Sequence, residues 1–234
     1  MVAVLAATLV VGATVQGLVG LGVGLVSAPV VILLAPELMP GLLLFMGFFT
    51  PAFTLVADRS DIDWRGLGWS LPFRVPGTVL GVALVAAVSE RALGLVVGVM
   101  VLLTVLVTWR TLRLPITRTN LSLAGLVSGV TGTATSIGGP PLAVLYQHER
   151  AARIRNTLAV YFAVGAVLSL IGLAIAGRIT RAEIGLAGLF LPALVLGLLL
   201  ASAVRRKLPT DSIRNGVLVV CAVSAVALVV RSAL

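Results

Sequence analysis

Long apolar runs, separated by short charged segments, dominate the pattern of this chain. A helix needs about 20 predominantly apolar residues to cross a bilayer. Runs of that kind predict ordinary membrane-spanning helices over residues 38–57, 64–88, 92–109, 157–176, 184–204 and 213–232. The pattern therefore predicts an all-α polytopic membrane protein.

Two other charge-free stretches do not fit single straight spans. Residues 2–35 are long for one crossing and short for two, and residues 121–147 are also longer than one crossing requires. Glycine clusters interrupt both stretches, GLVGLGVG at 17–24 and SIGG at 136–139. We expect each to be a helix pair broken by glycine and proline.

The two interrupted stretches match each other, which predicts a tandem duplication with repeat 1 at residues 1–112 and repeat 2 at residues 113–234. Each repeat would hold one interrupted pair and three spans. Transporters are often built from such repeats, and paired interrupted segments mark their substrate sites. The matches are Gly17/Gly129, Gly20/Gly132 and Pro29/Pro141 at a shift of 112 residues, Pro76/Pro192 and Gly81/Gly197 at 116, and Arg110/Arg231 at 121.

Composition supports the membrane assignment. Of 234 residues, 59% are apolar and 11% charged, and mean hydropathy is +1.17, whereas soluble domains are about 25% charged. A soluble enzyme, a disulfide scaffold and a disordered tail are excluded. The net charge of +9 comes from arginines between apolar runs, which is typical of loop anchors rather than of nucleic-acid binding.

The distribution of basic residues bears on topology. If each interrupted stretch crosses once, the eight crossings divide the loop basic residues evenly. If each stretch enters and returns on one side, the repeats are inverted, both termini face outward, and the basic residues concentrate on the inner side, as the positive-inside rule prefers. In that arrangement the rich side holds Arg59, Arg65, Arg110, Arg113, Arg118, Arg150, Arg153, Arg155, Arg205, Arg206, Lys207 and Arg214, and the poor side holds Arg91, Arg178, Arg181 and Arg231.

The two breaks are the expected substrate site, because irregular backbone at membrane depth occurs only inside protein or along a watered cavity. Ser27-Ala28-Pro29 and Gly139-Pro140-Pro141 are predicted to start second half-helices, whose N-termini would offer N–H donors to an anion. Packing of small residues is the alternative explanation. The candidate binding residues here are Gln16, Gly20, Gly22, Ser27, Ser128, Thr131, Gly132, Thr133, Thr135, Ser136, Gly138 and Gly139.

Arg74 is the remaining candidate, because it is the one charge well inside a predicted span. A buried arginine is costly in a membrane and needs a partner or a cavity. Arg74 would either supply countercharge to an anion or extend its side chain to the membrane surface.

The sequence lacks the residue patterns that nucleophilic catalysis, metal binding or phosphate binding would require. Ala134-Thr135-Ser136-Ile137-Gly138 lacks the first glycine of a nucleophile elbow, and neither a metal-ligand cluster nor a phosphate-binding loop is present. We therefore expect no catalytic residues, no metal and no cofactor.

At these residues the chain resembles the sulfite exporter TauE/SafE family of bacterial membrane proteins. The resemblance rests on GLVGLGVGLVSAP at 17–29, GVTGTATSIGGPPL at 129–142, Arg155-Asn156-Thr157 at the opening of the next span, and Pro76-Gly77-Thr78 followed by Gly81. It implies a secondary carrier for small sulfur-containing or organic anions, such as sulfite, thiosulfate or sulfoacetate.

The resemblance also implies a multi-pass protein of the inner membrane. A passive anion channel with the same half-helix site is the alternative function, and an enzyme is a third. The expected partners are a small anion and the lipid bilayer, with nucleic acid excluded. A coupling ion, proton or sodium, and a homodimer are left open.

Overall fold

Helices form the architecture of the part of the chain that the computed structural model describes, residues 1–19, 23–109, 114–205, 221–223 and 225–230. The all-α prediction is confirmed for these residues. The helices are α1 (Val2–Val19), α2 (Val23–Leu34), the short 3₁₀ helix η1 (Pro36–Leu38), α3 (Gly41–Ala57), α4 (Trp64–Ala87), α5 (Glu90–Trp109), α6 (Arg118–Thr135), α7 (Pro140–Tyr146), α8 (Ala151–Ile175) and α9 (Arg181–Arg205).

The predicted spans correspond to α3, α4, α5, α8 and α9, and the last predicted span lies largely outside the described residues. The helices α4, α8 and α9 are long and apolar enough to cross a bilayer. Large apolar side chains are exposed along them, including Phe73, Val79 and Leu199. An apolar outer surface of this kind suits lipid rather than water.

Each interrupted stretch forms two helices that double back. Between α1 and α2, an ideal Cβ added to Gly12 would lie 2.8 Å from the Ser27 hydroxyl. Between α6 and α7, Leu121 near the start of one helix shares a buried cluster with Leu145 near the end of the other. The turns of the two pairs meet, since an ideal Cβ on Gly24 would lie 2.4 Å from the Ser136 carbonyl oxygen.

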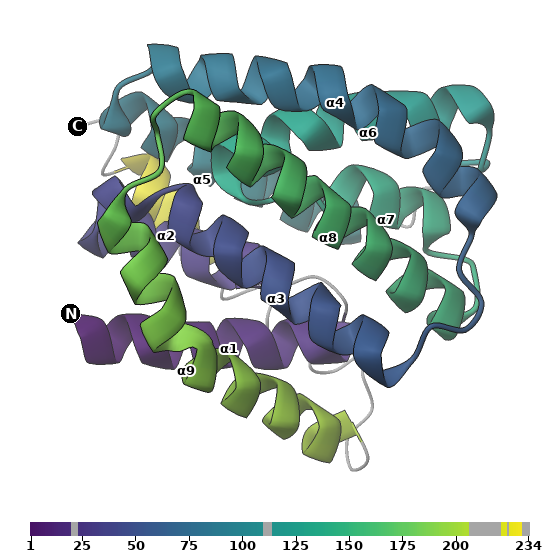
Figure 1. Ribbon diagram of the computed structural model, residues 1–234, viewed down its shortest axis with the longest axis horizontal. Helices are drawn as coiled ribbons and strands as arrows, with labels where there is room; N and C mark the ends of the chain where they lie inside the picture. Colours follow the sequence, from purple (N-terminus) through teal and green to yellow (C-terminus); the bar gives the residue numbers. More distant parts are fainter. Residues whose placement is uncertain (20–22, 110–113, 206–220, 224, 231–234) are drawn as a thin grey trace.

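Close helix pairing organises the rest of the bundle (Figure 1). The helices α4 and α6 run along one side, α1 and α9 along the opposite side, and α3 and α8 lie between. Glycines permit the close approach: an added Cβ on Gly125 would lie 2.1 Å from the Ser70 carbonyl oxygen, and one on Gly197 would lie 2.5 Å from the Val10 carbonyl oxygen.

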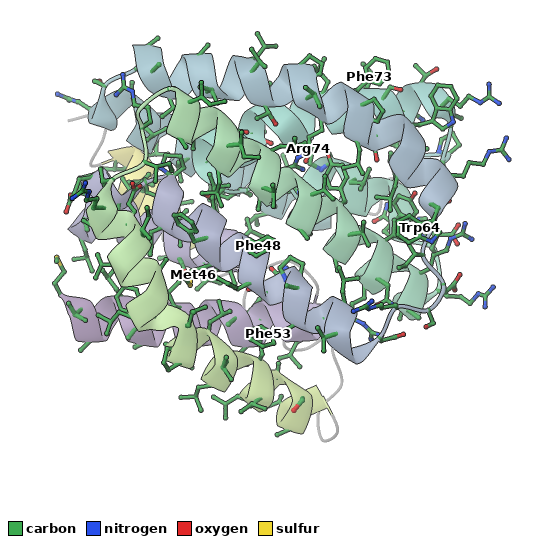
Figure 2. The ribbon with its side chains drawn as sticks, viewed as in Figure 1. Met46, Phe48, Phe53, Trp64, Phe73 and Arg74 are labelled. Carbon is green, nitrogen blue, oxygen red and sulfur yellow. The ribbon has the colours of Figure 1, made fainter. Side chains whose placement is uncertain are left out.

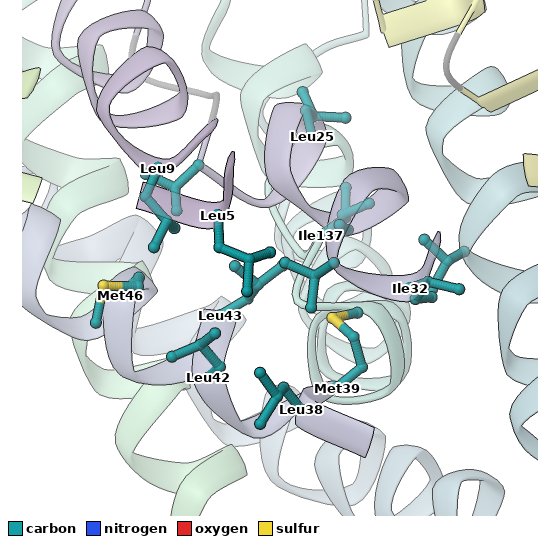
Figure 3. Close-up of a cluster of buried hydrophobic side chains, with 14 of the residues drawn as sticks. Leu5, Leu9, Leu25, Ile32, Leu38, Met39, Leu42, Leu43, Met46 and Ile137 are labelled. Atoms are coloured by element: carbon teal, nitrogen blue, oxygen red, sulfur yellow. The ribbon is translucent and has the colours of Figure 1, made fainter. Parts of the chain in front are cut away.

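The largest buried apolar cluster joins the first interrupted pair to the second break. Figure 3 shows its leucines from α1 and α3, such as Leu5 and Leu42, with Ile137 of the second break among them. In a bilayer such a cluster is held by close van der Waals packing, because lipid tails are as apolar as leucine. The cluster therefore holds the two breaks against each other.

Polar caps explain where several helices begin. Asp63 Oδ1 accepts a hydrogen bond from the Gly66 N–H at 3.0 Å and starts α4, and Thr117 caps α6 through the Asn120 N–H. Thr180 and Glu183 form a reciprocal capping box at the start of α9. These side chains satisfy N–H groups that the first turn of a helix leaves without a partner.

Two predicted boundaries are wrong. Pro29 lies inside α2, which begins at Val23 rather than at Ser27. Its missing N–H leaves the Leu25 carbonyl without the usual intrahelical bond, but buried residues on both sides of the proline, such as Leu25 and Val31, favour a continuous helix. The helix α8 begins at Ala151, so Arg155-Asn156-Thr157 lies within the helix rather than opening it. Ion pairs of Arg153 and Arg155 with aspartates stabilise this charged first part of α8.

Candidate functional site

A cavity of about 70 Å³ lies where the two breaks meet. Helices α1, α2, α3, α4, α6 and α8 all contribute to its wall, together with the loop between α6 and α7. The site residues predicted from sequence that line it are Gln16, Arg74, Gly132, Ser136, Gly138 and Gly139. The cavity therefore brings together residues from both halves of the chain.

Arg74 supplies the positive charge of this cavity. It lies on α4, its side chain points inward toward α8 (Figure 2), and only 3% of the residue is exposed. The side chain does not reach the surface, so the alternative that Arg74 extends to the membrane surface is wrong. Among the described residues, no acidic residue lines the cavity and Arg74 makes no salt bridge.

Residues on α6 and α8 hold the guanidinium group of Arg74 in place. Arg74 Nη1 donates to Ser128 Oγ at 3.1 Å, and its guanidinium carbon lies 4.6 Å from the centre of the Tyr161 ring. Gly165, one turn beyond Tyr161, leaves room for the guanidinium, because a Cβ there would lie 2.0 Å from Arg74 Cζ. The Nε–H of Arg74 is buried and has no hydrogen-bond partner.

Ser128 links the arginine to the second break. Its hydroxyl accepts from Arg74 and donates to the Gly138 carbonyl oxygen. An added Cβ on Gly132 would lie 3.0 Å from Arg74 Nη2 and 3.1 Å from Gly138 Cα. This glycine thus lets the arginine and the loop backbone approach each other closely.

The second break is a tight turn set by Ser136. Ser136 ends α6 in the left-handed conformation, with φ of 60°, which is uncommon for a residue other than glycine. Its hydroxyl donates to the Pro40 carbonyl oxygen at 3.0 Å, which ties the turn to the start of α3. The helix α7 then begins at Pro140, as predicted.

The start of α7 offers few anion donors. Pro140 and Pro141 occupy its first two positions, and proline has no N–H. In the first break, the Val23 N–H donates to Gln16 Oε1 at 3.3 Å. Arg74 is therefore the strongest anion donor in the cavity.

Several predicted residues lie elsewhere. Gly20 and Gly22 fall outside the described residues. The other hydroxyls are buried in helix contacts or bonded to their own helix. Ser27 donates to the Thr8 carbonyl oxygen, Thr131 to that of Val127, Thr135 to that of Thr131, and Thr133 bonds Ser169.

The sequence reading did not identify Thr50, Tyr161, Phe162 or Gly165. Thr50 and Phe162 line the cavity, and Tyr161 and Gly165 contact Arg74. Only the glycine in the middle of a predicted span could have drawn attention to this part of α8. In the described part of the chain, no group of three or more histidine, cysteine, aspartate or glutamate residues could hold a metal ion.

A polar network fixes the loop between α3 and α4 to the neighbouring helix ends. Tyr146, at the end of α7, donates to Asp63 Oδ2 at 2.8 Å, and Arg153 on α8 lies 3.6 Å from the same carboxylate. Burial opposes ionisation of Asp63, but hydrogen bonds from the Gly66 N–H and Tyr146 outweigh it and lower the pKa of Asp63 below its usual value. The carboxylate therefore stays charged in this network.

A bundle with paired broken helices, an apolar outer surface and a buried arginine at a central cavity is that of a polytopic helical membrane protein. Residues 4–228 match the family described as sulfite exporter TauE/SafE, and the chain belongs to this family. Its members are membrane transporters of sulfite and related anions rather than enzymes. The curated proteins and the solved structures contain no match to this chain.

Proposed function

We propose that this protein is a secondary transporter of small sulfur-containing anions, namely sulfite, thiosulfate, sulfoacetate and related organosulfonates or organic acids. The single observation that carries the proposal is the buried Arg74, which lines the central cavity with its Nε–H unpartnered. A desolvated guanidinium without a carboxylate is costly in a membrane protein unless an anion complements it. Its planar fork suits an oxyanion.

The size of the cavity supports a small substrate. One water needs about 10–15 Å³ of such space, so a cavity of about 70 Å³ has room for a few heavy atoms. Pockets for larger organic ligands measure about 300–1,000 Å³. A sulfur oxyanion with three or four oxygens has about the size that this cavity can hold.

Transport around this cavity would use two inverted repeats, residues 1–112 and 113–234. In support, residues matched between the repeats lie at corresponding interfaces. Gly17 on α1 approaches α9, and its match Gly129 on α6 approaches α4. Gly81 on α4 approaches α6, and its match Gly197 on α9 approaches α1.

The meeting of the two breaks at Gly24 and Ser136 supports re-entrant pairs that enter from opposite faces. Each repeat then contributes three crossings, so both termini face outward and the arginine-rich loops face the cytoplasm. Rocking of one repeat against the other would expose the cavity to each side of the inner membrane in turn.

The test is solid-supported-membrane electrophysiology on the reconstituted protein, with protein-free liposomes as the control. Sulfite, thiosulfate, sulfoacetate and short carboxylates are applied in turn, with and without a proton or sodium gradient. We expect saturable currents for sulfur anions and counterflow of unmodified labelled substrate, which a channel would not show. Currents no larger than those of empty liposomes for every anion would contradict the proposal.

A further inference from the structure

A second, smaller pocket of about 20 Å³ lies between α1, α3 and α8. Its walls include Thr54 on α3 and Arg155 on α8. Arg155 is 33% exposed, so this pocket reaches the surface at the end of the bundle where α8 begins. Arg155 and Thr54 do not line the central cavity around Arg74.

Among the described residues, Gln16 and Phe162 line both the small pocket and the central cavity. They project from α1 and α8 respectively. The two spaces are therefore neighbours, and the Gln16 amide and the Phe162 ring lie at the boundary between them. An anion that passed this boundary would travel from Arg155 toward Arg74 without crossing the apolar core.

Arg155 is held in a rigid frame. Its Nη2 contacts Asp58 Oδ2, and its Nε donates to Asn156 Oδ1 at 3.3 Å. The next two residues fasten the same loop, because Asn156 donates to the Ser60 carbonyl oxygen at 2.7 Å and Thr157 accepts from the Asp63 N–H at 2.9 Å. Three consecutive residues of α8 thus fix the loop between α3 and α4 and hold the guanidinium in place.

Asp58 balances the positive charge of Arg155, but not all N–H groups of the guanidinium are used in hydrogen bonds. Hydrogen bonds from the Ser60 hydroxyl and N–H hold the pKa of Asp58 well below its usual range, so Asp58 is ionised at any physiological pH. The ion pair leaves the pocket close to neutral. A guanidinium has five N–H donors, and among the described residues Arg155 Nη1 has no hydrogen-bond partner.

We propose that the small pocket is an entry subsite for anions on the side of the arginine-rich loops, in which Arg155 receives the substrate anion and passes it to the central cavity between Gln16 and Phe162. The inference rests on the proposed transport function and adds the route and its cationic residue. Arg155 Nη1 binds the arriving oxyanion while Asp58 remains on Nη2. The carboxylate limits the affinity, so that the anion is not trapped before it reaches Arg74.

The test measures the charge preference of the pocket directly. Thr54 is replaced by cysteine in a Cys221→Ala background, and the purified full-length protein is treated with 2-sulfonatoethyl or 2-trimethylammonioethyl methanethiosulfonate. The first reagent is an organosulfonate anion and the second a cation of similar size. The ratio of their modification rates reports the electrostatic potential at the pocket.

Removing one unit charge at ~8 Å in water-like surroundings changes each rate a little over twofold, so the ratio changes about fivefold. We expect Arg155→Gln to lower the anion-to-cation ratio about fivefold and Asp58→Asn to raise it by a similar factor. The double variant should return to the parent ratio, and Arg155→Lys should retain it. A cysteine at Ser89, at the far end of α4, should give the same anion-to-cation ratio in all these variants.

Transport provides the second measurement. Arg155→Gln should raise the substrate concentration for half-maximal current a little over twofold for a monovalent anion and about fivefold for a divalent one, while the dissociation constant measured at equilibrium on the purified protein changes less than twofold. An unchanged reagent ratio in Arg155→Gln, with wild-type currents intact, would overturn the subsite and leave the proposed function standing. Absent currents in the wild type would instead overturn the proposed function.

Discussion

Gly165→Ala tests whether the position of the Arg74 guanidinium matters for anion binding, without changing the arginine itself. The added Cβ would lie 2.0 Å from Arg74 Cζ and 2.1 Å from its Nε, whereas non-bonded carbons approach to about 3.5 Å. The guanidinium must therefore move by ~1.5 Å. Because the group is 3% exposed and packed between α6 and α8, the movement strains its bond to Ser128 and its position over Tyr161.

The expected magnitudes follow from those contacts. Loss of a charged hydrogen bond costs about 1.5–3 kcal/mol and loss of a buried cation–π contact about 2 kcal/mol or less, while alanine recovers about 1 kcal/mol of helix propensity. The protein should be destabilised by about 1–4 kcal/mol. Moving the charge from ~4 to ~5.5 Å from an anion, at an effective dielectric of ~20, removes about 1 kcal/mol of attraction, or about sevenfold in affinity.

The assay is a sulfite titration of detergent-purified protein, paired with thermal unfolding. Gly188→Ala on α9 is the matched control, because nothing lies within 4 Å of a Cβ added there, and it should bind like the wild type. Wild-type affinity in Gly165→Ala would refute the reasoning that Arg74 must sit where it does.

Three further predictions concern topology, the breaks and the loop network. In a cysteine-free background, cysteines at Thr119 and Ser212 should both be protected from an impermeant thiol reagent applied outside, and one at Ser89 should react; labelling of only one of Thr119 and Ser212 would contradict the re-entrant arrangement. Gly24→Leu should abolish transport with normal membrane insertion, because its Cβ would lie 2.4 Å from the carbonyl oxygen at the second break; wild-type transport would show that the breaks need not touch. Tyr146→Phe should lower the melting temperature at pH 7 through loss of about 1.5–3 kcal/mol, because the lost hydrogen bond is to a charged carboxylate. Since the folded pKa of Asp63 is lowered, this difference should persist above pH 4 and disappear as the pH falls below that range; an equal difference at pH 3 would contradict this role of the carboxylate.

Local chemistry made much of the helical framework predictable. The helix α4 was predicted over residues 64–88 and spans Trp64–Ala87, because charged residues before Trp64 and Asp63 as cap mark its start. The start of α8 was predicted six residues late. Arginines there suggested a loop, but their partners, Asp58 and Asp63, belong to a loop distant in sequence.

The site was predictable only in part. A charge within an apolar run drew attention to Arg74, and the glycine clusters located the breaks. The seat of the guanidinium depends on Ser128, Tyr161 and Gly165, which meet α4 only after the bundle packs, so no local pattern encodes it. Hydroxyls such as Thr131 and Thr135 looked available in sequence, but they bond their own helix.

The most direct test of an anion site at Arg74 is a binding titration of sulfite with Arg74→Gln, at matched fold stability. A charge at ~4 Å in an effective dielectric of ~20 contributes about 4 kcal/mol before desolvation, and half of that exceeds tenfold in affinity. We predict that Arg74→Gln binds sulfite at least tenfold more weakly than the wild type, with Arg74→Lys intermediate because it lacks the planar fork. An unchanged dissociation constant in Arg74→Gln would contradict the anion site.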